Sequence, residues 1–169
     1  ISYIFISTSL AVAQSDMELG IKNYNDRSSG SIESKASETI ISSAIHYFEN
    51  AIKIKNNERE AGIFLLKCYY FKGKHVATND NDRKSLYNLG KNLGEKLIMT
   101  YPESAAIRYW YLINLGSWAE VYGTLAAARE GVADIMRKQS KKIIELDQYY
   151  ANGGGYFMLG AVHLKSPRI

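Results

Sequence analysis

The chain contains the stretch ENAIKIKN at residues 49–56, and two related stretches follow it at equal spacing, EKLIMTYP at 95–102 and KKIIELDQ at 141–148. Two sets of apolar residues in these stretches are each spaced 46 residues apart: Ile52, Ile98 and Ile144, and Ala51, Leu97 and Ile143. A fixed period of about 20–50 residues is typical of repeat proteins, because one unit cannot bury its apolar face alone. The spacing therefore predicts units that stack to form one continuous core.

Around these stretches, apolar residues recur with the period of an α-helix, about 3.6 residues. The pattern predicts helices at 15–24, 36–54, 58–72, 83–100, 103–122, 132–146 and 156–165. Polar or glycine-containing loops are expected at 25–34 and 77–82. We expect Gly73 and the glycines at 153–155 to end helices, and Pro102 to lie in the first turn of one. The sequence thus predicts an all-α fold of antiparallel helix pairs joined by short loops.

The composition is that of a folded globular domain. Of the 169 residues, 46% are apolar and 22% are charged, and the net charge is +4. The densest basic run comprises Arg137, Lys138, Lys141 and Lys142. We interpret this run as a solvated helix face, with phosphate binding as the alternative. Cys68 lies in an apolar run, which favours burial as a small hydrophobic residue.

Residues 1–13 have the character of a secretory signal peptide. They are uncharged and mostly apolar, and they end in the small-residue pattern Ala11-Val12-Ala13. We expect a signal-peptide remnant at 1–13, cleavage before Gln14 and export to the periplasm; an N-terminal helix is the alternative. Residues 14–169 then form a single helical-repeat domain. Because a fourth copy of the repeat would begin at about residue 187, we also expect this domain to be truncated at its C-terminus.

The residues of the repeat resemble those of tetratricopeptide-like proteins. The stretch AIHYFENAIKI at 44–54 looks like the second helix of such a repeat and its exit. A longer pattern resembles the T-component family of tripartite ATP-independent periplasmic (TRAP) transporters, and its matching residues are Arg108-Tyr109-Trp110, Asn114-Leu115-Gly116, Ile144-Glu145-Leu146-Asp147, Tyr150, Gly153-Gly154, Leu159-Gly160 and Lys165-Ser166-Pro167. The resemblance implies a right-handed superhelix of stacked hairpins that docks a periplasmic solute-binding protein or holds an apolar ligand. Some family members are lipoproteins, and this chain lacks the corresponding cysteine.

The aromatic helix predicted at 103–122 carries the candidate binding residues. These residues are Arg108, Tyr109, Trp110, Asn114, Trp118 and Tyr122. The positions 110, 114, 118 and 122 fall on nearly one face of a helix. This face is either the wall of a groove, oriented by Asn114, or part of the core between repeats. Arg108 either binds a carboxylate or covers the helix face.

Aromatic residues also follow the repeat, since Phe64, Trp110 and Tyr156 are again spaced 46 residues apart. By contrast, catalytic motifs are missing from the pattern. His46, His75 and His163 lack the spacing of metal ligands. No Lys-Ser/Thr pair follows the glycines at 153–155, so we do not interpret them as a phosphate loop.

We therefore predict a non-enzymatic periplasmic scaffold without a cofactor. Its expected partner is a protein, with a periplasmic solute-binding protein as the candidate, and not a nucleic acid. Two alternatives stay open. The first is a carrier that binds an apolar small molecule or a lipid between its helices, and the second is a structural or assembly factor of the cell envelope that forms homo-oligomers.

Overall fold

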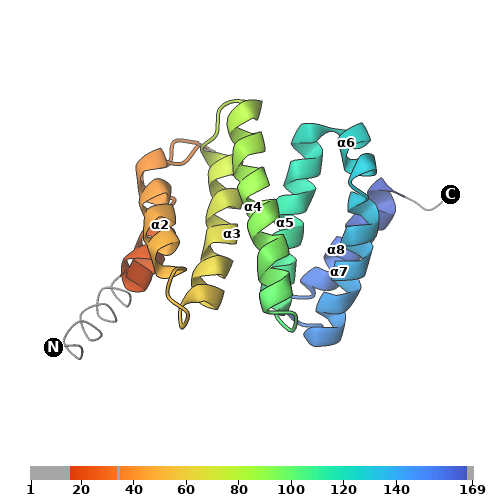
Figure 1. The fold of residues 1–169 in the computed structure, drawn as a ribbon. Helices are drawn as coiled ribbons and strands as arrows, with labels where there is room; N and C mark the ends of the chain where they lie inside the picture. Colours follow the sequence, from red (N-terminus) through yellow and green to blue (C-terminus); the bar gives the residue numbers. More distant parts are fainter. Residues whose placement is uncertain (1–15, 34, 167–169) are drawn as a thin grey trace.

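Helices make up most of the part of the chain that the structure describes. The computed structural model describes residues 16–33 and 35–166, so the signal peptide expected at 1–13 lies outside the described residues. Residues 16–25 are helical. The helices that follow are α2 (Glu38–Ala51), α3 (Glu58–His75), α4 (Asp80–Thr100), α5 (Ala105–Tyr122), α6 (Thr124–Arg129), α7 (Val132–Leu146) and α8 (Gly154–Lys165), shown in Figure 1. Within the described residues the fold is all-α, with one isolated bridge between Ile32 and Lys35 as its only extended pairing.

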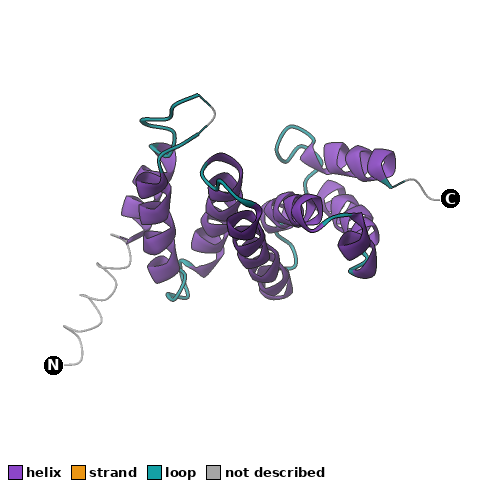
Figure 2. Cartoon of the chain, turned by 90° about the horizontal axis from the view of Figure 1, so that it is seen from above, coloured by secondary structure: helices purple, strands orange, loops and turns teal. Residues whose placement is uncertain are grey.

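Neighbours in sequence are neighbours in space. Each helix from α2 to α7 packs against the helix that follows it, and α3 also packs against α5, as α5 does against α7. Seen from above in Figure 2, the helices stand side by side in a row. The loop 26–33 and helix α8 lie at opposite ends of this row and project to the same side.

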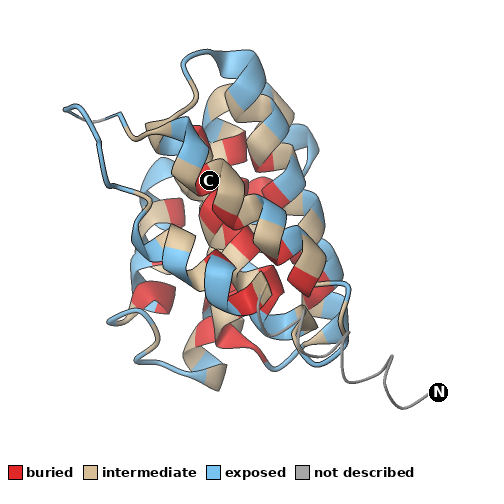
Figure 3. Cartoon of the chain, turned by 90° about the vertical axis from the view of Figure 1, so that its left-hand side faces the viewer, coloured by how far each residue is buried: buried red, intermediate tan, exposed pale blue. Residues whose placement is uncertain are grey.

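The repeated apolar residues occupy equivalent places in three of these helices. Ala51, Leu97 and Ile143 lie near the C-terminal ends of α2, α4 and α7, and all are buried. Their neighbours one residue later, Ile52, Ile98 and Ile144, are half-buried. Leu97 joins Leu66 of α3 and Ile107 of α5 in one cluster, which ties three helices together. Figure 3 shows the buried residues concentrated inside the stack.

The helix boundaries depend on local capping. The hydroxyl of Ser104 accepts a hydrogen bond from the backbone N–H of Ile107 (3.3 Å), and the side chain of Asn79 accepts one from that of Asp82 (3.0 Å). These caps start α5 and α4. Helix α5 therefore begins after Ser104, so the prediction that Pro102 lies in its first turn was wrong. Gly123 (φ 87°) and Gly131 (φ 64°) adopt left-handed angles that separate α5, α6 and α7.

The predictions that helices end at Gly73 and at the glycines 153–155 were wrong. Glycines there allow close packing of neighbouring side chains instead. Gly73 lies inside α3, which continues to His75. A Cβ at Gly73 would come within 2.5 Å of the Tyr87 ring, so the glycine makes room for this side chain from α4. Gly154 and Gly155 lie inside the first turn of α8, and Gly153 (φ 81°) precedes them.

Glycines likewise allow α4 to pack closely against its neighbours α3 and α5. A Cβ at Gly62 of α3 would lie 2.6 Å from Leu97 Cδ1, and one at Gly94 of α4 would lie 2.8 Å from Tyr111 Cβ. Each glycine thus leaves the space that a large side chain of the next helix fills. Since protein interiors are close-packed, these contacts fix the distances between helices.

Replacing Gly94 with alanine tests this packing. The new methyl group collides with Tyr111 Cβ, which cannot move without its backbone, and overpacking costs about 1–3 kcal/mol. The gain in helix propensity offsets about 1 kcal/mol of this cost. We expect Gly94→Ala to lower the free energy of unfolding by up to about 2 kcal/mol in urea denaturation. Gly160→Ala in α8 is the control, because a Cβ there meets nothing within 4 Å. It should raise stability slightly, and equal effects of the two substitutions would contradict the packing argument.

Two buried tyrosines donate hydrogen bonds to glutamate side chains of neighbouring helices. Tyr69 of α3 donates a hydrogen bond to Glu49 Oε1 (3.2 Å), and Tyr111 of α5 donates one to Glu95 Oε1 (3.4 Å). Burial, and then the adjacent carboxylate, raise the pKa of both phenols well above the ordinary value. A phenol whose pKa is raised on folding binds its proton more tightly in the folded state.

The raised pKa values predict the behaviour of the protein in alkali. The stabilising contribution of these phenols is complete below the ordinary phenol pKa of about 10 and is lost as the pH rises above it. Urea denaturation at increasing pH should show the free energy of unfolding falling above about pH 10. The fall should be shallower for Tyr111→Phe and unchanged for Tyr149→Phe, since Tyr149 is 79% exposed. The same steep fall in Tyr111→Phe as in the unmodified protein would count against this account.

Candidate docking surface

Arg108 is engaged within the fold. It is 8% exposed, and its Nε and Nη2 atoms donate hydrogen bonds to the carbonyl oxygen of Pro102 (3.1 and 2.6 Å). Its Nη1 atom donates to the side-chain oxygen of Gln139 on α7. Burial lowers the pKa of the guanidinium group. Arg108 therefore holds the turn before α5 against α7, and its donors are directed inward.

Asn114 lies deeper still, with no exposed surface. Its Nδ2 atom donates hydrogen bonds to the carbonyl oxygens of Leu66 (2.9 Å) on α3 and Trp110 (2.8 Å) on α5. The absence of a side chain at Gly90 on α4 makes room for it. Its Oδ1 atom is buried without a hydrogen-bond partner among the described residues. Asn114 thus links α3 to α5 in the interior.

Trp118 and Tyr122 form a polar clamp between α5 and α4. The indole Nε1 of Trp118 donates to Asn88 Oδ1 (2.7 Å), and Asn88 Nδ2 donates to the hydroxyl of Tyr122 (2.6 Å). The two rings stack with their centroids 4.5 Å apart. Trp118 is 5% exposed, so the helix face defined by residues 110, 114, 118 and 122 is directed largely into the α4–α5 interface.

Tyr109 and Trp110 belong to a different set of residues. Half-buried aromatic rings form two contacting groups, one on the first helix and α3 and the other on α3, α5 and the segment before α8, and we call the whole set the aromatic strip. Its members are Tyr24, Phe64, Tyr70, Tyr109, Trp110 and Tyr150. Ring centroids are 5.4 Å apart for Tyr24 and Phe64, and 6.3 Å apart for Tyr70 and Trp110. Tyr109 contacts both Trp110 and Tyr150 at 5.5 Å.

Three cations lie on this strip, and one of them, the exposed Lys74, is 5.4 Å from the centroid of Tyr70 and donates a hydrogen bond to its hydroxyl (2.9 Å). The Lys67 ammonium group is 4.6 Å from the centroid of Phe64, 5.7 Å from that of Trp110 and 5.9 Å from that of Tyr24. The Arg27 guanidinium carbon is 4.0 Å from the centroid of Tyr24. Lys67 thereby connects the rings of Phe64 on α3 and Trp110 on α5, which are not in direct contact. Cations are attracted to aromatic faces at such distances.

Of the strip, sequence reasoning named only Tyr109 and Trp110 as candidate binding residues, although Phe64 was noted as a repeat position and Tyr150 as part of the family resemblance. The repeat held a signal for others, since Tyr24 and Tyr70 are spaced 46 residues apart, as are Phe64 and Trp110. The third copy of the latter position, Tyr156, is 53% exposed, and its hydroxyl donates to Gln148 Oε1 (3.5 Å). Lys67 and Arg27 carried no repeat signal, and only the fold brings them to the aromatic rings.

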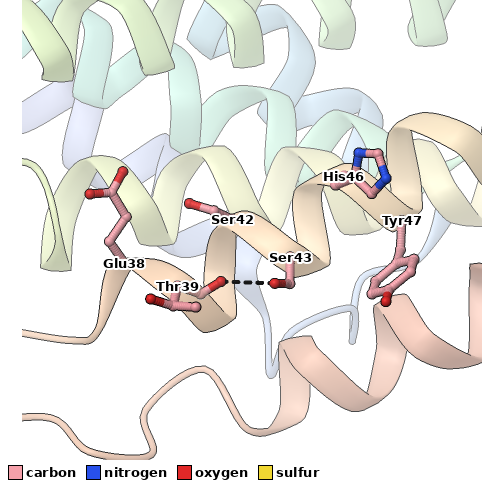
Figure 4. A pocket seen from close by; sticks show the side chains of 6 residues that line it. All are labelled: Glu38, Thr39, Ser42, Ser43, His46 and Tyr47. Carbon is pink, nitrogen blue, oxygen red and sulfur yellow. Dashed lines mark hydrogen bonds between the residues drawn. The ribbon is translucent and has the colours of Figure 1, made fainter.

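Two of the pockets on the described surface are lined by polar and charged residues. One, of about 540 Å³, lies along α2 and is lined by Glu38, Thr39, Ser42, Ser43, His46 and Tyr47. Figure 4 shows these side chains arising from successive turns of one helix, with the Ser43 hydroxyl donating to the backbone oxygen of Thr39 (3.0 Å). The other, of about 320 Å³, is lined by Arg108, Lys138, Gln139, Lys142 and Glu145. Neither pocket includes a member of the aromatic strip.

The basic run on α7 is not solvated throughout, so that interpretation was wrong for one residue. Arg137 is 6% exposed, and its guanidinium group binds Asp134 Oδ1 (2.9 Å) and the carbonyl oxygen of Ser166. It holds the end of α8 against α7. Lys138 and Lys141 are exposed, as expected. Cys68 is fully buried, and burial raises the pKa of its thiol.

Among residues 16–33 and 35–166, no group of three or more His, Cys, Asp or Glu side chains is placed to hold a metal ion. No helix in this part of the chain combines the length and the apolar character that crossing a bilayer requires.

Comparison of the chain with protein-family models, curated proteins and solved structures finds no match. The functional inference therefore depends on the residues of the fold and of the aromatic strip.

Replacing Asn88 tests the clamp between α4 and α5. Asn88→Ala removes the acceptor of the Trp118 indole and the partner of Tyr122, and a buried unpaired donor costs about 1–3 kcal/mol. We expect the free energy of unfolding to fall by about 2 kcal/mol. Asn92→Ala, at an exposed position of the same helix, is the matched control and should be nearly neutral. Equal losses for the two variants, measured by urea denaturation, would show that the clamp does not stabilise the interface.

Proposed function

We propose that this chain is a non-enzymatic helical-repeat scaffold that docks a protein partner on the aromatic strip. The observation that carries the proposal is the clustering of partly exposed rings on three helices and the segment before α8, in two contacting groups that Lys67 connects. Aromatic side chains and arginine dominate the binding energy of protein interfaces, because they combine large contact area with few rotatable bonds. Rings that already contact one another lose little further freedom when a partner binds.

The packing of the helices supports a stacked, tetratricopeptide-like array as the finer description of the fold. In such an array, the first helix of each pair contacts the first helix of the next pair. The contacts of α3 with both α4 and α5, and of α5 with α7, follow this order if α3 and α5 are first helices. The buried positions Ala51, Leu97 and Ile143 then mark the ends of successive second helices. The aromatic strip would lie on the first helices.

The resemblance of residues 108–167 to the TRAP T-component family supplies the candidate partner, a periplasmic solute-binding protein. The composition of residues 1–13 supports export to the periplasm. Both parts of this proposal rest on the sequence.

A docking surface explains the strip better than a carrier does. A carrier for an apolar ligand would enclose the ligand in an apolar cavity. The rings of the strip are partly exposed, and neither of the two pockets of about 540 and 320 Å³ includes one of these rings. These observations favour an open surface as the place where a partner binds.

Binding measurements test the proposal. A periplasmic solute-binding protein encoded beside this chain should bind it with a dissociation constant of tens of micromolar or tighter in calorimetry. Trp110→Ala, which removes the largest ring of the strip, should weaken binding at least about tenfold, the loss of about 1.4 kcal/mol typical of an interface anchor. Circular dichroism should confirm that the variant is folded.

Phe157→Ala is the matched control, since Phe157 is a 72%-exposed aromatic residue of α8 outside the strip. It should leave the affinity unchanged. No complex at tens of micromolar would contradict the candidate partner, and a complex equally sensitive to both substitutions would contradict the aromatic strip as the docking surface.

A further inference from the structure

Two of the three cations on the aromatic strip, Arg27 and Lys67, share one ring. Arg27 lies 4.0 Å from the centroid of Tyr24, and Lys67 lies 5.9 Å from the same centroid. Arg27 also lies 5.1 Å from the centroid of Phe71. Two like charges are therefore held close together among aromatic rings, where water is partly excluded.

Neither charge is neutralised by a carboxylate among the described residues. Other half-buried lysines are paired: Lys72 with Glu38 at 2.9 Å, and Lys91 with Glu130 at 3.1 Å. No described carboxylate lies within ion-pair distance of Lys67 or Arg27; Glu60 acts on Lys67 only from farther along α3. The pair is thus a local excess of positive charge.

The hydrogen bonds of Arg27 also indicate room for an anionic partner. Its Nη1 atom donates to the carbonyl oxygen of Tyr24 (2.7 Å), whereas its Nε atom is buried without a hydrogen-bond partner in the described structure. An unpaired buried donor is costly, and an incoming acceptor removes this cost. Burial and the charge of Arg27 lower the pKa of Lys67, which is the direction expected for a cation that lacks an anionic partner.

We propose that the strip recognises an acidic segment of the partner, in which a carboxylate binds at Arg27 and Lys67 and adjacent apolar side chains pack on Phe64, Tyr70 and Trp110. This inference rests on the proposed docking function and specifies the chemistry of the partner. A charge-assisted hydrogen bond in a partly dehydrated site is stronger than one between exposed side chains. The surrounding rings supply apolar contact, so the strip selects carboxylates that lie beside apolar residues.

Selection of peptides tests this inference without a known partner. Random dodecapeptides displayed on phage are selected against the whole chain, and the recovered sequences are compared with the unselected library. We expect enrichment of Asp or Glu next to aromatic or aliphatic residues. A selected peptide and its counterpart with Asn or Gln in place of Asp or Glu are then synthesised with a fluorescent label and titrated by anisotropy.

Variants of the chain assign the interaction to the two cations. The acidic peptide should bind Lys67→Gln at least about tenfold more weakly than the unmodified chain, whereas its amide counterpart should bind both equally. Lys138→Gln, the same change at an exposed lysine of α7, is the matched control and should have no effect. If Lys67→Gln does not fold, Arg27→Gln gives the same comparison, since Arg27 lies in the turn after the first helix.

The outcomes distinguish failure of the acidic-partner inference from failure of the docking function. Peptides that need Trp110 but lack acidic residues, or that bind Lys67→Gln unchanged, would overturn the acidic partner and leave docking intact. Tight binding of an oligothymidylate probe that depends on Lys67 would also overturn it, in favour of base stacking with phosphate contact. Peptides that bind equally well to Trp110→Ala, or no selected peptides at all, would contradict the docking function of the strip itself.

Discussion

The close contact of α4 with α3 and α5 is the constraint on which the rest of the structure depends. Gly62 accommodates Leu97 on one side of α4, and Gly90 and Gly94 accommodate Asn114 and Tyr111 on the other. These contacts bring α3 and α5 so near each other that Asn114 reaches the backbone of α3. The same proximity places Tyr70 beside Trp110, without which the aromatic strip would be interrupted.

The sequence predicted the helices well where their residues face one environment. The helix at 132–146 coincides with α7, because its apolar residues recur at helical spacing and a glycine precedes it. Predictions at Gly73 and at 153–155 were wrong for a common reason. A glycine that ends a helix and a glycine that admits a neighbouring side chain are identical in sequence, and only the partner helix distinguishes them.

The candidate site was less predictable, because helical spacing identifies a face but not what lies against it. Residues 110, 114, 118 and 122 do share a face of α5, yet α4 covers much of it through the Asn88 clamp. Trp110 contributes to the surface because it meets Tyr70 and lies near Lys67. Such contacts between distant parts of the chain leave no local pattern. α8 offers a second set of exposed apolar residues, Tyr156, Phe157 and Leu164, but no cation–ring contact is formed there in the described structure.

Side-chain footprinting with hydroxyl radicals tests the central claim most directly, because it reports which aromatic side chains a bound partner covers. The chain is oxidised alone and in complex with its partner, and the modified residues are quantified by mass spectrometry. The docking account predicts that Phe64, Tyr70 and Trp110 become protected while Phe157 is oxidised equally in both states. Protection confined to Tyr156 and Phe157 on α8, with the strip unchanged, would contradict it.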